Sequence, residues 1–411
     1  MKIRNEEISA KRQKKENVIL FAGATSFLGS RLAIQYLKNG QHVIFLVRSK
    51  DNESPRERLD KLFRVWDYDQ LDSARVTILE SQLDEPKLGL SDEDYRYVVE
   101  QTDEIIHGAA NTAMEEEKRY EVQHFNIEGT KNLLQVAIEG KAYFFHFMST
   151  CYSCGTRGGT IYEDYVPHTD FYNPYEESKH IAEKNIIEQC SKYGIRYHII
   201  RPSIVFGDSK TGKATRFNAF YYFVRTLDYL KNIYEKDYDK NGIRSKEIGI
   251  YRTPEGKLYI PLRIEIKKGS FFNIIPIDYF IKASNAIMDD SLNGGIFHVT
   301  NPTPTYLQKT LENFCKLHNI EGLQAITEEE FKQKEPNVIE KLYQEYMDIY
   351  RPYFRDTRIF NIDNTLSYTS PKGIEIGQLS NEEVFNRCVE FATKVKYGKL
   401  LDSYVEKSQL I

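Results

Sequence analysis

The sequence has few cysteines and no long apolar run. Its 411 residues include only five cysteines, an odd and small number that argues against a disulfide framework. No apolar run reaches the roughly 18 residues that a membrane helix needs. The first apolar run, residues 18–22, follows a charged stretch and is too short for a signal peptide. We therefore expect a cytoplasmic protein without a membrane span.

The sequence also lacks a strong excess of either charge. Its 56 Lys and Arg residues against 60 Asp and Glu residues give a formal net charge of -4, so no general basic field indicates a nucleic-acid partner. Internal repeats are absent as well, which argues against a solenoid. Residues 1–16 are basic on balance but contain three glutamates. We expect a solvated N-terminal extension there, with a docking arm as the alternative.

What the sequence contains is an alternation of short apolar runs and longer amphipathic stretches. Helices are predicted between the runs, including a long one over residues 175–193. Continuous apolar strands separated by helices predict a parallel sheet that is covered on both faces. The predicted fold class is therefore α/β, a Rossmann-like doubly wound sheet whose ligand lies at the carboxyl ends of the strands. Strands are predicted at 18–22, 42–47, 75–79, within 104–110, at 144–149 and at 196–202.

The alternation stops after about residue 208, which predicts a two-lobed molecule. Residues 17–208 are assigned to the nucleotide-binding domain, with a return segment at about 270–300. Residues 209–411 are assigned to a smaller, mixed α/β substrate lobe, which includes a hairpin at 251–262. This lobe is mostly helical, and its last 90 or so residues are expected to be helical and aromatic. Substrate is expected to bind between the two lobes.

The first predicted strand runs directly into a glycine turn, Gly23-Ala-Thr-Ser-Phe-Leu-Gly29, and a helix begins there. Free N–H groups and the helix dipole at such a turn favour a phosphate, so we expect the pyrophosphate of a dinucleotide here. Ser26 stands where glycine is usual. Its small hydroxyl can admit the pyrophosphate or donate a hydrogen bond to it. An ordinary strand–helix turn is the alternative.

The residue that follows the second strand indicates which dinucleotide binds. An acidic residue at this place would bind the 2′-hydroxyl of the adenosine ribose. The strand is followed instead by Arg48, 19 positions after Gly29, and a guanidinium pairs well with a 2′-phosphate. Arg58, in the next predicted helix, can assist. We therefore expect NADPH rather than NADH, with a solvated surface arginine as the alternative.

Four residues on later elements indicate reductase chemistry. Tyr175 and Lys179 lie at i and i+4 on one predicted helix, so they share a face. Lys179 can lower the pKa of the Tyr175 phenol and hold the nicotinamide ribose, which makes the phenol a usable general acid. Thr150 ends the fifth strand, and its hydroxyl can donate to the same substrate oxygen. Asn126, in the preceding helix, can hold a water that relays protons to Lys179.

Together these motifs resemble the extended short-chain dehydrogenases/reductases. Within that superfamily the chain is most similar to the thioester reductases and fatty acyl-CoA reductases, and the match spans roughly residues 17–300. The stretches that carry the resemblance are GATSFLG (23–29), HGAA (107–110), NIEGT (126–130), MSTCYSCG (148–155), YEESK (175–179) and RPSIVFGDSKTG (201–212). Those typical of the reductase group are LVRS (46–49), RERL (56–59), LGLSDEDY (88–95) and GDSKTG (207–212).

The resemblance implies NADPH bound by the glycine turn, and the roles given above for Thr150, Tyr175 and Lys179. No metal site is expected. Three features depart from the family pattern: Ser26 replaces the middle glycine, Gln82 stands where an aspartate usually contacts the adenine, and residues 112–120 are unusually acidic. Cofactor contacts are expected from Gly23, Thr25, Ser26, Phe27, Leu28, Gly29, Arg48, Arg58, Gln82, Leu83, Ala109, Tyr175, Lys179, Pro202, Ser203 and Val205.

The reaction implied is NADPH-dependent reduction of an acyl thioester to an aldehyde, with further reduction to an alcohol left open. The acyl group would arrive in trans on acyl-CoA or on an acyl carrier protein. One alternative is an NADPH-dependent ketone or aldehyde reductase with the same site residues. Another is a non-catalytic binding protein that senses NADP(H). A sugar-nucleotide dehydratase is less favoured, because no acid pair follows Thr150.

Other residues indicate function less strongly. Cys151 and Cys154 form a C-x-x-C pair, but no second pair accompanies it, and we expect both to line the pocket behind Thr150. His107 and His146 lie in predicted strands and are expected to be packed structural residues. The aromatic run at 217–223 is expected either to line an acyl groove or to pack in the core.

Overall fold

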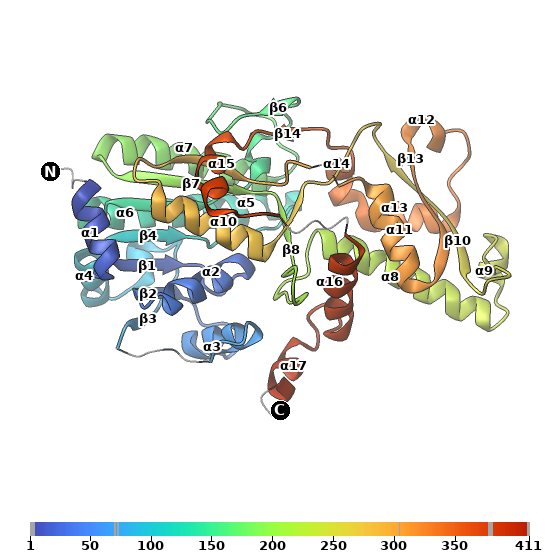
Figure 1. The fold of residues 1–411 in the computed structure, drawn as a ribbon, viewed down its shortest axis with the longest axis horizontal. Helices are drawn as coiled ribbons and strands as arrows, with labels where there is room; N and C mark the ends of the chain where they lie inside the picture. Colours follow the sequence, from blue (N-terminus) through green and yellow to red (C-terminus); the bar gives the residue numbers. More distant parts are fainter. Residues whose placement is uncertain (1–4, 70, 72–73, 304, 377–380, 409–411) are drawn as a thin grey trace.

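A seven-stranded parallel sheet forms the centre of the larger lobe (Figure 1). The structure is a computed structural model and describes residues 5–69, 71, 74–303, 305–376 and 381–408. The strand order is β3-β2-β1-β4-β5-β7-β12, so the order reverses between β1 and β4, as in a doubly wound fold. The strands are β1 (Val18–Ala22), β2 (His42–Val47), β3 (Val76–Glu80), β4 (Glu104–His107), β5 (Phe144–Met148), β7 (Arg196–Pro202) and β12 (Gly295–Val299).

Alternate residues of the strands point to opposite faces of the sheet and meet two layers of helices. Ile19 and Phe21 of β1 pack with helices on one face, whereas Leu20 and Ala22 pack with helices on the other. Both faces are therefore buried, which explains the continuous apolar strands and confirms the predicted Rossmann-like α/β fold. The first face is covered by α2 (Phe27–Lys38), α3 (Pro55–Val65) and α10 (Ile277–Asp290), and the second by α4 (Asp92–Gln101), α6 (Gly129–Gly140) and α7 (Pro174–Tyr193).

The N-terminal extension packs on the larger lobe rather than lying free in solvent. Its helix α1 (Asn5–Lys14) buries Ile8 completely. Arg12 forms a two-pronged ion pair with Glu104 at the start of β4, with N–O distances of 2.9 and 2.7 Å. Glu104 also lies 2.9 Å from Nε2 of the buried His146. Burial would raise the pKa of Glu104, but Arg12 and His146 hold it well below its usual range. The extension is thus anchored through a buried ion pair, a kind of contact that is costly to break.

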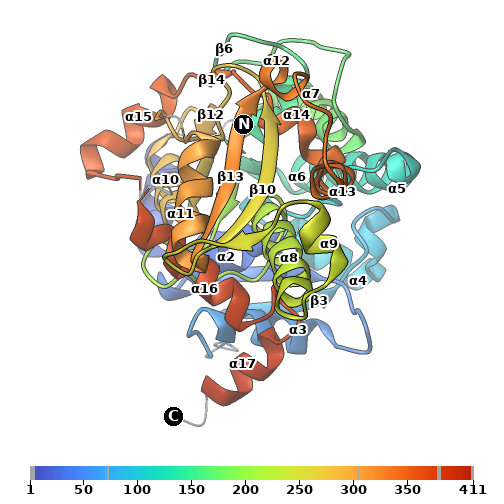
Figure 2. The same ribbon diagram turned by 90° about the vertical axis from the view of Figure 1, so that its right-hand side faces the viewer.

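The smaller lobe combines a long helix, a three-stranded sheet and several shorter helices (Figure 2). The predicted hairpin is present, since β9 and β10 pair antiparallel. On its other edge β10 pairs with a parallel strand, β13, in a stretch that was expected to be helical. The elements are α8 (Phe220–Asp239), α9 (Ile243–Glu247), β9 (Tyr251–Arg252), β10 (Leu258–Ile266), α11 (Leu307–His318), β13 (Ile320–Thr327), α12 (Glu328–Phe331), α13 (Val338–Met347), α14 (Arg351–Phe354), α16 (Glu382–Lys394) and α17 (Leu401–Ser408).

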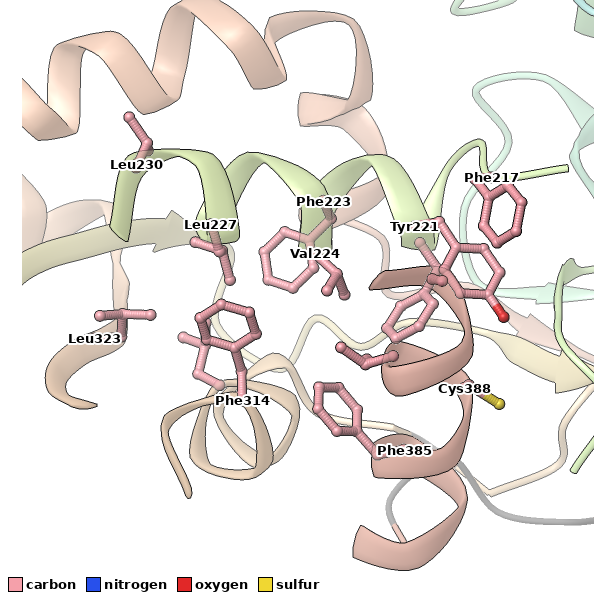
Figure 3. Close-up of a cluster of buried hydrophobic side chains, with 14 of the residues drawn as sticks. Phe217, Tyr221, Phe223, Val224, Leu227, Leu230, Phe314, Leu323, Phe385 and Cys388 are labelled. Carbon is pink, nitrogen blue, oxygen red and sulfur yellow. The ribbon is translucent and has the colours of Figure 1, made fainter. Parts of the chain in front are cut away.

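The core of the smaller lobe is strongly aromatic. Phe223 points from α8 into the part of this core that holds Phe314 of α11, whereas Tyr221 lies beside Phe217 and points toward Cys388 of α16 (Figure 3). The aromatic run at 217–223 therefore packs mainly in the hydrophobic core, which was the second of the two expectations for it. Phe220 and Phe223 also border a small cavity of about 20 Å³.

The chain returns twice from the smaller lobe to the larger one. The first return contains β11, α10 and β12, which together span residues 274–299. The second return contains β14 and α15, which packs against α10 and β12. Part of the stretch assigned from sequence to the substrate lobe therefore packs on the larger lobe. In the first return, β11 (Ile274–Pro276) pairs with β8 (Ile204–Phe206). In the second, β14 (Ile359–Phe360) pairs with β6 (Thr160–Ile161) and is followed by α15 (Asp363–Thr369).

The described residues show neither a membrane-spanning helix nor a cluster of metal ligands. Among them, no helix combines the length and the apolar character needed to cross a membrane. Within the same residues, no three His, Cys, Asp or Glu side chains gather as a metal site would require.

Candidate active site

A cleft of about 310 Å³ lies between the two lobes at the carboxyl ends of the strands. The glycine turn after β1 forms one wall, and the ends of β5 and β7 and the start of α7 form others. The smaller lobe closes the cleft with side chains from before α8 and from around α14. Its lining includes Ser26, Phe27, Thr150, Tyr175, Lys179, Arg216, Tyr350 and Tyr353.

Two glycines allow the turn after β1 to approach β4 closely. Gly23 has a φ of +103°, and a Cβ at this position would overlap the backbone of Gly108 and Ala109. A Cβ on Gly29 would overlap the carbonyl group of Gly23. Only glycine fits both positions, which leaves bare backbone at the N-terminus of α2. This narrow turn, opening onto the cleft, fits the pyrophosphate of a dinucleotide.

Ser26 is explained by the start of helix α2. Its backbone is extended, with φ −94° and ψ 169°, so the position does not require glycine. Its Oγ accepts a hydrogen bond from the backbone N–H of Gly29 at 3.0 Å. Such an N-cap stabilises a helix by about 1 kcal/mol. The hydroxyl hydrogen of Ser26 is still available to donate into the cleft.

Three arginines form a positively charged group beside the glycine turn. Arg58 donates a hydrogen bond to the backbone carbonyl of Arg48. Burial and the charges of Arg48 and Arg216 lower the pKa of Arg58, and the neighbouring Glu53 and Asp51 oppose this effect without cancelling it. Like charges held together in this way favour a bound anion. Arg216, which also lines the cleft, was not singled out from the sequence.

Thr150 is fixed by a short helical turn at the end of β5. The turn, η4 (Cys151–Cys154), starts at Thr150, whose Oγ accepts a hydrogen bond from the backbone N–H two residues later at 3.3 Å. Below it, the buried carboxylate of Glu183 accepts hydrogen bonds from Ser149 and Ser153, on either side of the turn's start. The hydroxyl hydrogen of Thr150 is not used in these contacts and can be donated into the cleft.

Lys179 lies on α7 with its side chain buried beneath the cleft. Its Nζ donates a hydrogen bond to the carbonyl oxygen of Met148 at 2.7 Å and lies 4.3 Å from the centre of the Phe147 ring. Burial lowers the pKa of Lys179 to about 7, although Glu183 opposes this effect. Negative charge brought close to this lysine, such as that of a bound dinucleotide, would raise its pKa and favour the ammonium form.

Tyr175 stands at the first turn of α7 and lines the cleft with Thr150 and Lys179. Burial raises the pKa of its phenol, and the charge of Glu176 raises it further. The expected lowering by Lys179 is not seen, and burial has the largest effect on the pKa of this phenol. The phenol is therefore held in its protonated form, which is the form that a general acid needs.

Asn126 holds helix α7 in place. It is buried in a π-helical turn, η3 (His124–Glu128), that precedes α6. Its Oδ1 accepts from the backbone N–H of Asn111 at 2.8 Å, and its Nδ2 donates to the carbonyl of Asn111 at 2.9 Å. Nδ2 also donates to Ser178 at 2.8 Å, directly beside Lys179. Both amide hydrogens are thus used on protein groups, and a positioning role fits this geometry better than the expected water relay.

The remaining expected cofactor residues lie at the same edge of the sheet. Gln82 donates through its amide to Asp84 at 2.9 Å, which leaves its carbonyl oxygen available for an adenine amino group. The cleft lining contains Ser26, Phe27, Leu28, Tyr175, Lys179, Pro202, Ser203 and Val205. Outside the lining, Gly23, Thr25, Gly29, Arg48, Gln82, Leu83 and Ala109 follow the ends of β1 to β4, and Arg58 lies on α3.

Cys151 and Cys154 lie below the cleft rather than in its lining. Both pack in a small buried cluster with Tyr353 of the smaller lobe and Phe360 of β14. Burial raises the pKa of both thiols, so neither is a reactive thiolate at neutral pH. The expectation that they line the pocket behind Thr150 is therefore wrong.

The smaller lobe supplies cleft residues that the sequence did not indicate. Asn218, Tyr350 and Tyr353 line the cleft in addition to Arg216. They come from stretches without a recognisable motif, and only the packing of α8 and α14 over the strand ends brings them to the cleft. From the acidic stretch at 112–120, Thr112 and Met114 reach the cleft, and neither is charged.

Comparison with known sequences identifies the family. Residues 21–284, more than half of the chain, match the model of the male sterility protein family. The chain is 29% identical over 224 residues to fatty acyl-CoA reductase 1 of Mus musculus, covering 46% of this chain and 43% of that protein. It is 30% identical over 200 residues to the hybrid PKS-NRPS synthetase pvhA of Talaromyces variabilis, covering 46% of this chain and 4% of that protein. The chain thus spans less than half the length of these curated relatives.

Solved structures share the fold over most of the chain. The terminal R domain from the myxalamid PKS-NRPS pathway superimposes with a TM-score of 0.72 at 19% identity, covering 93% of this chain and 91% of that one. A thiolation-reductase di-domain from an archaeal non-ribosomal peptide synthetase gives 0.70 at 18% identity, with coverages of 96% and 82%. UDP-glucuronic acid 4-epimerase from Bacillus cereus, in complex with NAD, gives 0.59 at 16% identity, with coverages of 93% and 98%. The family match confirms the resemblance noted in the sequence, and the chain belongs to the male sterility protein family.

Proposed function

We propose that the protein is an NADPH-dependent reductase that converts an acyl thioester, carried on CoA or on an acyl carrier protein, into an aldehyde. The observation that carries the proposal is one cleft that joins the glycine turn to Thr150, Tyr175 and Lys179 and is closed by a second lobe. Membership of the male sterility protein family and the similarity to a fatty acyl-CoA reductase support this reaction class.

The glycine turn and the arginine group support NADPH as the cofactor. Gly23 and Gly29 leave room for the pyrophosphate at the N-terminus of α2. Arg48, Arg58 and Arg216 supply guanidinium groups for a 2′-phosphate, and repulsion among them is relieved when that phosphate binds. When bound, NADPH supplies a hydride to the carbonyl carbon.

Replacing Arg58 by alanine tests the choice of cofactor. We expect the Kd for NADPH to rise by about 10- to 100-fold, because one charge-assisted hydrogen bond contributes about 1.5–3 kcal/mol. The Kd for NADH should change little, since NADH has no 2′-phosphate. Both constants can be measured by fluorescence titration. Arg56→Ala is the matched control, because Arg56 lies on the same helix and pairs with Asp60 at 3.2 Å. Equal losses for NADPH and NADH would contradict the assignment.

The chain's own groups act mainly on the carbonyl oxygen. As hydride reaches the carbonyl carbon, negative charge develops on this oxygen, and Thr150 and Tyr175 donate hydrogen bonds to it. Tyr175 then supplies the proton, which its raised pKa has retained until that point. Lys179 holds the ribose of the cofactor and keeps positive charge beside Tyr175. The carbon–sulfur bond then breaks, the proton passes from the oxygen to the departing sulfur, and the thiol leaves while the aldehyde remains.

An apolar pocket extends from the cleft into the smaller lobe and supports an acyl substrate. Ile204, Ala219, Tyr350 and Tyr353 line both spaces, and the rest of its lining is also apolar or aromatic. Its volume of about 20 Å³ is roughly the space of one water or methyl group. We infer that short acyl chains fit with little rearrangement, whereas longer chains must displace aromatic side chains. The other lining residues are Phe220, Phe223, Phe272, Ile274, Met347 and Phe354.

A turnover assay tests the proposed reaction. NADPH oxidation and the release of free thiol would be followed together, with acyl-CoA and acyl carrier protein thioesters of increasing chain length. We expect turnover that falls with chain length, and one thiol released for each NADPH oxidised if the aldehyde is the product. Two NADPH per thiol would indicate an alcohol. Turnover of simple ketones or sugar nucleotides without turnover of any thioester would refute the proposal.

A further inference from the structure

A buried carboxylate connects the catalytic helix to the smaller lobe. Glu176, the residue after Tyr175, is fully buried. Its Oε1 accepts a hydrogen bond from the hydroxyl of Tyr353 at 2.6 Å, and its Oε2 accepts one from the backbone N–H of Tyr172 at 3.3 Å. Tyr353 belongs to α14, 177 positions further along the chain. A carboxylate at the first turn of the catalytic helix therefore holds a side chain of the opposite lobe.

Tyr353 touches both elements that carry the catalytic residues. Its hydroxyl accepts a hydrogen bond from Nδ2 of Asn173 at 2.9 Å, and Asn173 caps α7 by accepting from the backbone N–H of Glu176 at 3.0 Å. Its ring packs edge-on against Tyr152 of η4, with 4.9 Å between ring centres. The same ring also lines the cleft. One side chain of the smaller lobe therefore contacts the start of α7, the turn η4 and the substrate space.

The groups around Glu176 allow its charge to change near neutral pH. Burial raises the pKa of Glu176 to about 7, against the opposing effects of Tyr353, Arg358 and the backbone of Tyr172. Asp356 raises it further, but Asp356 pairs with Arg358 at 2.8 Å, so the charges of these two partly offset each other. The remaining titratable neighbours are Tyr175, on the same helix, and Cys151 and Cys154, in η4.

We propose that Glu176 is a positioning residue that couples the seating of the smaller lobe to the acid Tyr175. The proposal rests on the proposed reductase function. Ionised Glu176 takes a charge-assisted hydrogen bond from Tyr353, roughly twice as strong as a neutral one, which seats α14 over the cleft. The same charge favours the protonated phenol of Tyr175. Protonated Glu176 has neither effect, so the site is best assembled when this carboxylate is ionised.

The pH profile of kcat/KM separates this role from a merely structural one, because the profile reports ionisations of the free enzyme. In the wild type we expect kcat/KM to fall as the pH drops below about 7. Glu176→Gln keeps an acceptor for Tyr353 but cannot ionise, so this fall should disappear, and kcat/KM above neutral pH should be about ten-fold lower. Tyr353→Phe removes a hydrogen bond that lowers the pKa of Glu176, so the fall should move to higher pH.

Glu177→Gln is the matched control. Glu177 lies on the same turn of α7 but pairs with Arg119 outside the buried cluster, so its profile should match the wild type. Lys179 titrates in the same range but is present in all four proteins, and differences among them report on Glu176. A fall that survives in Glu176→Gln, or that stays in place in Tyr353→Phe, overturns the proposal.

Amide hydrogen exchange tests the seating of α14 without any turnover. Protection of residues 350–354, corrected for the intrinsic exchange rate, should be lower in the wild type at a pH below the fall in activity than at a pH above it. In Glu176→Gln it should be low at both, and in Glu177→Gln it should follow the wild type. If protection in the wild type does not change with pH, the coupling is refuted. If no thioester is turned over but protection changes as described, the proposed function fails and the link between Glu176 and Tyr353 stands.

Discussion

Tyr175→Phe is expected to lower kcat/KM for the thioester by about 10²- to 10⁴-fold, the usual contribution of a positioned general acid. The substitution removes the hydroxyl that donates to the developing oxyanion and keeps the ring in the lining of the cleft. The Kd for NADPH should stay close to that of the wild type, because the glycine turn and the three arginines are unchanged. Steady-state kinetics and a fluorescence titration of the same preparation measure both quantities.

Tyr193→Phe provides the control for this experiment. Tyr193 ends the same helix and its side chain is 50% exposed, so turnover should be unaffected. If Tyr175→Phe retained full activity, another group would have to protonate the product, and the role assigned to the phenol would be wrong. A wild-type protein that binds NADPH but turns over no substrate would instead favour the NADP(H)-sensing alternative.

Gly23→Ala is expected to abolish tight NADPH binding and to destabilise the fold. The added Cβ would overlap the backbone of Gly108 and Ala109, and a φ of +103° is unfavourable for alanine. Overpacking costs about 1–3 kcal/mol and a left-handed backbone about 1–2 kcal/mol, so we expect a loss of about 3 kcal/mol in the free energy of unfolding. Because the turn must move away from β4, the Kd for NADPH should rise roughly 100-fold, as expected for a misplaced binding group.

Gly158→Ala is the comparison for Gly23→Ala. Gly158 has no left-handed φ, and no atom lies within 4 Å of a Cβ placed there. Its urea midpoint and NADPH affinity should equal those of the wild type. If both alanine variants unfold at the same urea concentration, the close approach between the turn and β4 is not the constraint described above.

Local signals explain what the sequence could predict. Each inner strand is a short apolar run bounded by polar turns, and β7 occupies the predicted residues 196–202. Gly23 and Gly29 belong to one turn, and Tyr175 and Lys179 to one helix, so neighbouring residues define both groups. Ser26 had a local signal too, because a serine just before a helix is a favoured N-cap, and the structure shows this cap.

Contacts between distant parts of the chain explain what the sequence could not predict. Arg12 is anchored to Glu104, 92 positions away, and nothing near Arg12 indicates that partner. The buried role of Glu176 depends on Tyr353, whose surroundings contain no motif. β13 was missed because Gly322 interrupts its apolar pattern and because its partner β10 comes much earlier in the chain.

During synthesis the larger lobe cannot finish folding when its last sheet strand leaves the ribosome. Helix α15, which covers α10 and β12, and strand β14, which pairs with β6, follow the strands of the smaller lobe in the chain. The ion pair between Lys61 of α3 and Asp402 of α17, at 2.8 Å, can form only after α17 has also been synthesised. The surface of α10 that α15 covers therefore stays exposed until residue 369 has emerged, a state in which unfinished chains tend to aggregate. The two lobes consequently reach their final structure together, and a fragment cut after β12 would expose the surface that α15 covers.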